Sequence, residues 1–394
     1  MPVTLTADRV TPQGLRKSLP GLWSLGLASC LAVTTEMLPV GLLPDIGHTF
    51  AVSDSVTGLL VSLYAVMVAT LAVPLTLATS RFARKPLLLA TLLGYALSNV
   101  LVAAAPVFGV VAAGRTVGGV THALFFSLII GYVPRLVARA DVGRALALVG
   151  GGASAGFVVG VPLSTTLGTA VGWRSSFAVL AVMAVLTFAL VSRLLPGVAH
   201  EPTAHRPDRR GRRQLTAVSM SNMLTFLGQF TVYTCISVVL LASGVAPVFV
   251  GPILLVCGAC GLLGLWYVGR DLDRNPRRTA LLILATLIGA LVVLGWAGST
   301  LVAVVLAAAV WNAAFGGVPS IYQACAVRTH AVSPEMAGAW TNATANVGIA
   351  GGAAIGAGLL NTTGLWSLPW AGACLATLGT AVVVLSRKAF PSRA

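Results

Sequence analysis

The chain has 394 residues, of which 57% are hydrophobic and only 9% are charged. A soluble domain has about 25% charged residues, so this composition excludes an ordinary soluble domain and indicates a chain that crosses a membrane many times. The formal net charge is +15, but the basic residues lie in short clusters between apolar segments, without interleaved aromatic residues. We therefore expect a lipid bilayer around the chain and no nucleic-acid partner.

The first apolar segment, residues 19–44, is long enough to cross a bilayer, which takes about 20 residues. It contains a single carboxylate, Glu36, deep within the apolar sequence. A charge at the centre of a membrane-spanning helix costs at least about 2.5 kcal/mol on insertion scales, so it is rarely tolerated without a partner or a task. Glu36 is therefore the first candidate functional residue.

Further apolar segments of helical length follow, which predicts twelve spans in two sets of six. The first set covers about residues 19–44, 54–79, 86–104, 107–134, 143–170 and 173–195. The second set covers about residues 215–243, 246–269, 279–298, 300–327, 334–361 and 364–387. Between the sets, residues 196–214 are polar, basic and proline-rich, which is typical of a flexible linker.

The predicted fold class is an all-α polytopic membrane protein with two pseudo-symmetric six-helix bundles, residues 19–195 and 215–388. Residues 1–18 and 389–394 are the expected tails. All but two of the 25 lysines and arginines lie in the tails, the linker and alternate loops, on one side of the predicted membrane. Basic residues are retained on the cytoplasmic side, so we expect a multi-pass plasma-membrane protein of bacterial type with both termini and the linker in the cytoplasm.

The two halves repeat each other. Basic segments of similar spacing follow the second and eighth spans, and a Gly-Gly-Val triplet lies at residues 118–120 and again at 316–318. The fifth and eleventh spans are both rich in glycine, which predicts close helix packing. Parallel six-helix repeats are a transporter architecture in which substrate binds between the halves, near the middle of the membrane.

Four ordered segments carry a resemblance to a known family. They are Thr35–Ile46 in the first span, Arg115–His122 in the fourth, Gly160–Leu163 in the fifth and Gly172–Phe177 at the start of the sixth. With the twelve-span layout, they make the chain resemble a major facilitator superfamily transporter of the drug/proton antiporter branch, and most of all the sugar-efflux and arabinose-efflux permeases. The resemblance covers about residues 19–388. It implies alternating access and proton-coupled export, with the acidic residue of the first span and the arginine of the fourth in the coupling.

The resemblance also implies a cytoplasmic gate at the two basic segments. The first segment has Thr76 and Ser80 where the family usually has Gly and Asp, whereas the second retains both, so the second is expected to carry more of the gate. The predicted gate residues are Arg81, Arg84, Lys85, Gly269, Asp273, Arg274, Arg277 and Arg278.

Glu36, Arg115 and His122 are the predicted proton-coupling residues, because only these ionisable side chains lie well inside predicted spans. At about 1.5 Å per residue, Glu36 and Arg115 both lie about 12 Å below the outer surface, which makes an ion pair feasible. Two interpretations stay open. The pair is a static salt bridge, or it is a proton site that switches when the arginine or a cationic substrate moves. His122 follows Arg115 by two helical turns and is either a proton relay or a neutral hydrogen-bonding residue.

A polar and aromatic face in the seventh span predicts part of a substrate cavity. It contains Asn222, Phe226, Gln229 and Tyr233, and polar contacts between helices are the alternative explanation. Further candidates from the second, tenth and eleventh spans are Tyr64, Trp311, Asn312, Tyr322, Gln323, Trp340, Asn342 and Asn346. These groups suit an amphipathic drug, a sugar or a nucleoside alike.

We therefore predict a proton-coupled secondary transporter that exports a small molecule and functions as a monomer. The alternatives are an uptake symporter or facilitator and, in another class, a non-transporting membrane sensor or an intramembrane enzyme. No P-loop, His-Glu-x-x-His or Gly-x-Ser-x-Gly motif is present, which argues against an ATPase or an enzyme. The six cysteines lie in apolar segments and the Cys257–Cys260 pair lacks further ligands, so no disulfide, metal or cofactor is expected.

Overall fold

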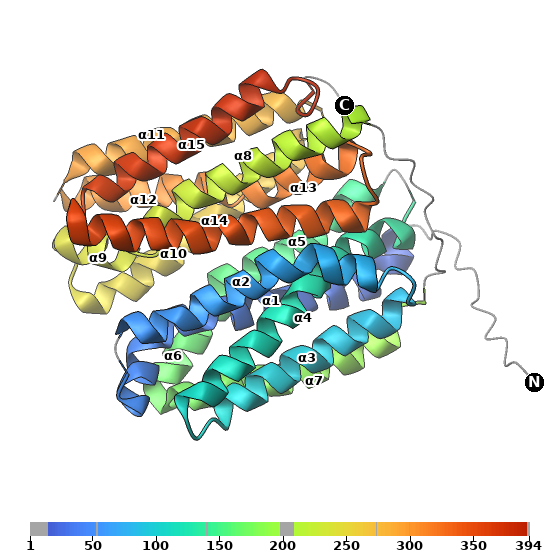
Figure 1. Ribbon diagram of the computed structural model, residues 1–394, viewed down its shortest axis with the longest axis horizontal. Coiled ribbons are helices and arrows are strands. Elements are labelled where there is room, and N and C mark those ends of the chain that lie inside the picture. The colour runs from blue at the N-terminus through green and yellow to red at the C-terminus, as the bar shows by residue number, and fades with distance from the viewer. Residues whose placement is uncertain are drawn as a thin grey trace, which may run out of the picture. The chain divides into compact units, whose positions relative to one another are not determined.

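The computed structural model describes residues 15–52, 54–138, 141–197, 209–272, 274–298 and 300–391, which form helices and the turns between them. These helices divide into two compact units, each a bundle of helices that run roughly side by side (Figure 1). Of these residues, those up to 156, those from 163 to 197 and those from 333 to 339 belong to unit 1, and the others belong to unit 2. Residues 1–14, 198–208 and 392–394 of the predicted tails and linker lie outside the described residues.

Long apolar sequences form these helices because a backbone inside a bilayer must satisfy its own hydrogen bonds. Unit 1 contains α1 (Leu15–Phe50), α2 (Asp54–Ala78), α3 (Arg84–Ala103), α4 (Phe108–Leu136), α5 (Val142–Ala155), all but the first two residues of α6 (Val161–Val171), and α7 (Trp173–Leu194). Unit 2 contains α8 (Arg209–Tyr233), α9 (Ile236–Ala242), α10 (Pro247–Asp271), α11 (Pro276–Ala297), α12 (Leu301–Phe315), α13 (Val318–Arg328) and α15 (Ser367–Leu385). The first turn of α14 (Pro334–Thr362) belongs to unit 1 and its remainder to unit 2. The predicted all-α membrane fold is confirmed.

Eleven helical segments of the described chain are long and apolar enough to cross a membrane. They match the predicted spans except the seventh, residues 215–243. There, α8 begins in a basic sequence at Arg209, carries serine, asparagine, threonine and glutamine along its length, and ends at Tyr233. Its apolar continuation is the separate helix α9. The polar residues that set this span apart are those of the predicted substrate face.

Two predicted spans are interrupted helices, and a third passes through a π-helical segment. The fifth consists of α5, a short π-helical segment (Gly156–Gly160) and α6. The seventh consists of α8 and α9, and the tenth consists of α12 and α13. Breaks at membrane depth free backbone groups that need other partners, and transporters use such discontinuous helices near their binding sites.

Close helix crossings are made at glycines. A Cβ atom on Gly152 of α5 would overlap the backbone of Gly26 in α1, and one on Gly264 of α10 would overlap the carbonyl of Ala313 in α12. In lipid, helices associate largely through such close packing. The predicted glycine row of the fifth span packs only in part, because a Cβ on the preceding Gly151 would meet nothing within 4 Å.

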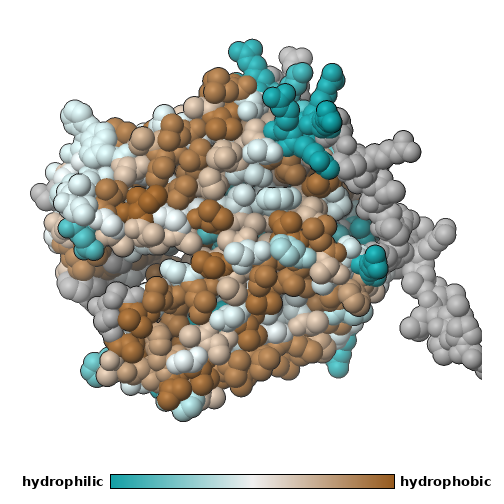
Figure 2. Space-filling view, in the orientation of Figure 1, coloured by the Kyte–Doolittle hydropathy of each residue, from teal (hydrophilic) through white to brown (hydrophobic). Residues whose placement is uncertain are grey.

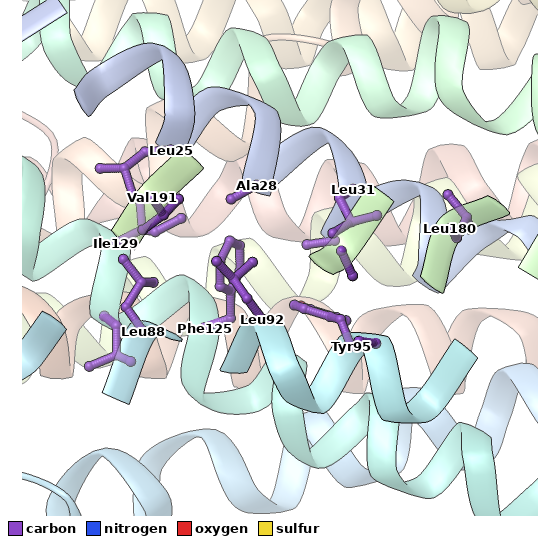
Figure 3. Close-up of a cluster of buried hydrophobic side chains, with 14 of the residues drawn as sticks. Leu25, Ala28, Leu31, Leu88, Leu92, Tyr95, Phe125, Ile129, Leu180 and Val191 are labelled. Carbon is purple, nitrogen blue, oxygen red and sulfur yellow. The ribbon is translucent and has the colours of Figure 1, made fainter. Parts of the chain in front are cut away.

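The apolar core of unit 1 lies among α1, α3, α4 and α7. Figure 3 shows the side chains that these four helices bring together. It labels Leu25, Ala28, Leu31, Leu88, Leu92, Tyr95, Phe125, Ile129, Leu180 and Val191. This core fixes α1 beside α4, which is the contact that carries the ionisable groups.

Apolar side chains also cover much of the outer surface. In Figure 2, hydrophobic residues extend along the helices of the visible face, and hydrophilic residues gather toward helix ends. Large exposed side chains include Trp266, Trp296 and Leu385. A soluble protein rarely exposes so much apolar surface, so these side chains are placed to face lipid.

Candidate functional site

The buried carboxylate of Glu36 lies within α1, and 10% of its side chain is exposed. Its Oε2 atom is 3.6 Å from Nε2 of His122 in α4. This separation is longer than a hydrogen bond, but it places a titratable ring directly beside the carboxylate. The structure therefore pairs Glu36 with the histidine of α4.

Arg115, also in α4, makes a different contact from the one predicted. Its Nη1 atom donates to the carbonyl oxygen of Thr35 at 2.7 Å, and its Nη2 atom donates to the carbonyl oxygen of Glu36 at 2.8 Å. The structure thus replaces the predicted side-chain ion pair with a clamp on the main chain of α1. The guanidinium also lies 4.2 Å from the ring centroid of Tyr64, a cation–π distance.

Proline explains why the main chain of α1 needs this donor. In an α-helix, the carbonyl of Thr35 accepts from the backbone nitrogen four residues later, which is Pro39. Proline has no N–H group, so the Thr35 carbonyl has no partner within the helix. Because nothing in a bilayer core replaces a missing partner, the buried guanidinium of Arg115 fills that place.

His122 lies in an aromatic box. Its Nδ1 atom and the hydroxyl of Tyr64 share a 2.9 Å hydrogen bond, and its ring contacts the rings of Tyr95 and Phe126. When the tyrosine hydroxyl donates to Nδ1, the remaining ring proton sits on Nε2, which is the nitrogen that faces Glu36. The predicted residues Glu36, His122, Tyr64 and Arg115 thus form one connected group inside unit 1.

Several residues of the predicted substrate cavity are hydrogen-bonded to helices of unit 2. The Asn222 amide donates to the Thr341 carbonyl and to Thr344 Oγ1, both at 2.8 Å. The Tyr322 hydroxyl bonds to Ser221 and Thr225 of α8 at 2.8 and 2.7 Å. Two other candidates differ: Asn312 donates to a carbonyl of its own helix, and Gln323 is half-buried.

Other cavity candidates leave buried polar atoms without a hydrogen-bond partner among the described residues. These atoms are Gln229 Oε1, Trp311 Nε1, Asn342 Nδ2 and Asn346 Oδ1. Phe226 and Tyr233 belong to a cluster of aromatic rings on the same helices. The polar-aromatic face predicted in the seventh span therefore contains both satisfied and unsatisfied groups.

The predicted gate residues of unit 1 differ in how deeply they are buried. Arg81 is exposed, and Lys85 donates to the Ser192 carbonyl at 2.8 Å. Arg84 is buried and pairs with the carboxylate of Glu335 in the first turn of α14, which Arg135 of α4 also approaches at 3.3 Å. Glu335 was not among the residues predicted from the sequence; the available signal was an acidic residue at a helix N-terminus, a position that favours negative charge.

The second predicted gate segment makes contacts within unit 2. Arg277 donates to the carbonyl oxygens of Val383 and Val384 at 3.0 and 2.8 Å, which ties α11 to the end of α15. Gly269, Arg274 and Arg278 are exposed. Asp273 lies outside the described residues.

The site residues offer titratable, amide and aromatic groups, and no set of three or more His, Cys, Asp or Glu among the described residues could hold a metal ion. The spans of this helical membrane bundle bury a carboxylate, a histidine and an arginine. Such buried ionisable groups are typical of a membrane transporter.

Comparison with known proteins identifies the family. The family model described as Major Facilitator Superfamily matches residues 25–340, and the chain belongs to this superfamily. It is 33% identical over 350 residues to a chloramphenicol efflux pump of Mycobacterium tuberculosis, covering 85% of this chain and 84% of the relative. It is 28% identical over 355 residues to a probable sugar efflux transporter of Mannheimia succiniciproducens, covering 89% of each.

A solved structure shows the same fold. The human organic anion transporter MFSD10 matches with a TM-score of 0.76 and 18% sequence identity, covering 94% of this chain and 100% of that one. The family and these relatives make the protein a multi-pass secondary transporter of small molecules rather than an enzyme. The predicted family membership is confirmed.

Proposed function

We propose that the protein exports a small molecule from the cytoplasm in exchange for protons, with Glu36 as the residue that carries the proton. The relatives named for sugar and chloramphenicol efflux support export. The distribution of basic residues supports an orientation with both termini in the cytoplasm. The observation that carries proton coupling is the buried Glu36 carboxylate, 3.6 Å from the imidazole of His122.

The geometry suggests how a proton changes this site. An ionised Glu36 attracts a hydrogen-bearing Nε2 of His122 across the α1–α4 contact, whereas a protonated Glu36 loses most of that attraction. Arg115 grips the main chain of α1 rather than the carboxylate, so the carboxyl group stays available for a proton. In this scheme, Arg115 positions Glu36 opposite His122, and proton uptake and release at Glu36 bias the protein between its two accessible states.

Inverted membrane vesicles test both direction and coupling. A proton gradient generated by ATP hydrolysis should drive accumulation of radiolabelled chloramphenicol or a sugar, and an uncoupler should abolish it. Glu36→Gln keeps size and hydrogen bonding but removes titration, so uphill accumulation should disappear while substrate counterflow persists. Asp45→Asn is the matched control, because Asp45 lies on the same helix but is exposed, and it should retain both activities.

Three results would contradict the proposal. Uphill transport by Glu36→Gln at the wild-type rate would remove Glu36 from the proton pathway and make His122 the next residue to test. Accumulation in intact cells, but not in inverted vesicles, would show an uptake symporter. Accumulation that only equilibrates, with no effect of uncoupler, would show a facilitator.

A further inference from the structure

Basic side chains gather at one end of unit 2 and are here called the basic patch. The patch consists of Arg209, Arg210, Arg212 and Arg213 at the start of α8, Arg278 at the start of α11, and Arg387 and Lys388 just after α15; all seven are exposed. In Figure 2, hydrophilic residues crowd the corner where Figure 1 places the start of α8 and the end of α15. Three helices therefore present cations on one surface.

Helix contacts hold these three segments together. A Cβ atom on Gly372 of α15 would meet the Gly228 carbonyl of α8 at 2.8 Å, and one on Gly379 would meet the Ser221 carbonyl at 3.2 Å. The two helices are thus antiparallel, and the end of α15 lies beside the start of α8. The contacts of Arg277 with the last carbonyls of α15 bring the start of α11 to the same end.

The four arginines of α8 face away from the bundle. At 3.6 residues per turn, they cover about 160° of the helix circumference, and Gly211 lies on the opposite side. That glycine is buried, and a Cβ atom on it would meet the Thr329 carbonyl at 3.0 Å and Cα of Ala331 at 3.1 Å. Helix α8 therefore packs through Gly211 and directs its guanidinium groups outward.

Carboxylates do little to balance the basic patch. The described residues of unit 2 contribute one, Asp271 of α10, whose Oδ2 atom accepts from the Tyr267 hydroxyl at 3.5 Å. In unit 1, by contrast, Arg84 and Arg135 share the carboxylate of Glu335. The basic patch therefore has a strongly positive potential, which attracts anions.

Apolar side chains border the basic patch. Leu385 is 82% exposed and Val384 is 46% exposed, directly before the cationic residues that follow α15. On α8, Met220 is 44% exposed, two turns beyond Arg213. Cations next to exposed apolar side chains suit the boundary between phospholipid headgroups and acyl chains. A soluble anion would leave these apolar side chains uncovered.

We propose that the basic patch binds anionic phospholipids, whose phosphate groups accept from its arginines and whose acyl chains pack against Val384 and Leu385. Arginine suits this role because its planar guanidinium group can hold a phosphate with two parallel hydrogen bonds. In the orientation proposed above, the patch faces the cytoplasmic leaflet, which is the leaflet rich in anionic lipids. Bound phosphates also relieve the repulsion among the arginines, so the lipid stabilises unit 2. Lipid binding of this kind requires neither proton coupling nor a particular substrate.

Native mass spectrometry of the purified full-length protein in detergent resolves individual bound lipids and tests the lipid class. Dioleoyl phosphatidylglycerol, an anion, is compared with dioleoyl phosphatidylcholine, which has the same acyl chains and no net charge. We expect phosphatidylglycerol to bind more tightly by about tenfold or more. Equal affinities, or tighter binding of phosphatidylcholine, would overturn the proposal.

A pair of double variants locates the site. Arg212→Gln with Arg213→Gln removes two charges from α8 and should weaken phosphatidylglycerol binding by about thirtyfold, with little effect on phosphatidylcholine. Arg16→Gln with Lys17→Gln is the matched control, because these residues are also adjacent, exposed and near the start of a helix, but belong to unit 1. The control should bind as wild type does. Equal affinities of the two double variants would overturn the location.

Soluble anions distinguish a lipid site from other anion sites. The midpoint of thermal unfolding in detergent should rise with phosphatidylglycerol and stay unchanged with glycerol 3-phosphate, which lacks acyl chains, or with poly-L-glutamate, an acidic peptide. Equal protection by glycerol 3-phosphate would indicate a site for soluble phosphates, and equal protection by poly-L-glutamate would indicate an acidic protein partner; either result would overturn the lipid assignment. If the α8 double variant does not fold, shown by gel filtration, Arg387→Gln with Lys388→Gln provides the same test at the end of α15.

Discussion

Replacing Glu335 with glutamine should strongly destabilise the protein. The side chains of Glu335 and Arg84 are each only 5% exposed, and they form an ion pair in unit 1. Removing one partner of a buried pair leaves the other charge uncompensated, which costs about 3–5 kcal/mol. Arg135, the second basic neighbour, has 27% of its side chain exposed and can turn to water, so it adds little to this cost.

Thermal unfolding in detergent, followed by intrinsic fluorescence, measures the effect. If unit 1 responds as a soluble domain of similar size does, a loss of 3–5 kcal/mol lowers the midpoint by about 6–20 °C. Asp141→Asn makes the same chemical change in an exposed pair, where Arg144 is 80% exposed and 3.9 Å away. Exposed pairs contribute up to about 1 kcal/mol, so this control should shift the midpoint only slightly.

Two further variants separate charge from shape. Replacing Arg84 and Glu335 together with methionine should recover most of the stability, since buried ion pairs are often replaceable by apolar residues. Gly131→Ala alters no charge, but its Cβ would overlap the Glu335 side chain, so it should also destabilise. Gly109→Ala, in the same helix, would meet nothing within 4 Å and is the control. An unchanged midpoint in both Glu335→Gln and Gly131→Ala would refute the reasoning.

Three other predictions concern the helix contacts and the transport cycle. Arg115→Ala should lower expression and thermal stability because it leaves the Thr35 carbonyl unsatisfied, and Arg115→Lys should recover only part because lysine cannot bridge two carbonyls with a planar fork; equal stability of all three proteins would disprove the clamp. Gly264→Ala should disrupt folding or oblige α10 and α12 to separate, whereas Gly269→Ala on the same helix should be tolerated, since only the first Cβ would meet a backbone carbonyl; matching yields in a fluorescence-detected gel filtration assay would contradict this. Chloramphenicol is uncharged, so its proposed exchange for protons moves net charge; rapid addition of chloramphenicol to proteoliposomes on a solid-supported membrane should give a transient current, and an electrically silent cycle would contradict proton-coupled export of this compound.

The depth of Glu36 and Arg115 in the membrane could be predicted from the sequence, but their atomic contacts could not. Counting residues along the first and fourth spans placed Glu36 and Arg115 at the same depth, and the two residues do meet. Depth along a helix does not determine which atoms of a side chain and a main chain pair. The signal for the main-chain contact was Pro39, four residues after Thr35, which removes a hydrogen-bond donor from α1.

The ion pair between Arg84 and Glu335 could not be predicted from the sequence, for a different reason. The sequence places Glu335 at the start of a span and Arg84 at the start of another, 251 positions apart. Hydropathy and charge segregation give each position along the membrane normal but not which helices are neighbours. The interruption of the seventh span was more predictable, because its polar residues and the basic start of α8 were visible in the composition.

The two units repeat one helix crossing but place different residues beside it. In unit 1, the Gly118-Gly119 pair of α4 packs against Tyr64 of α2, and Arg115 stands three residues before the pair. In unit 2, the Gly316-Gly317 pair packs against the backbones of Gly261 and Gly264 in α10, and the residue three before it is Ala313.

The corresponding crossings of the two units therefore contain different residues. In unit 1, an arginine and a tyrosine occupy the contact and hold α1, with its carboxylate, beside α4. In unit 2, the Ala313 carbonyl lies so close to Gly264 that even a Cβ would overlap it, and an alanine stands where unit 1 has the arginine, so this crossing contains no guanidinium. Without that cation, a carboxylate on the corresponding helix would lack the group that positions Glu36 in unit 1. Unit 2 buries uncharged amides, hydroxyls and aromatic rings instead, and among the described residues the buried carboxylates, arginines and histidine all belong to unit 1, which is why the proposed proton site lies there.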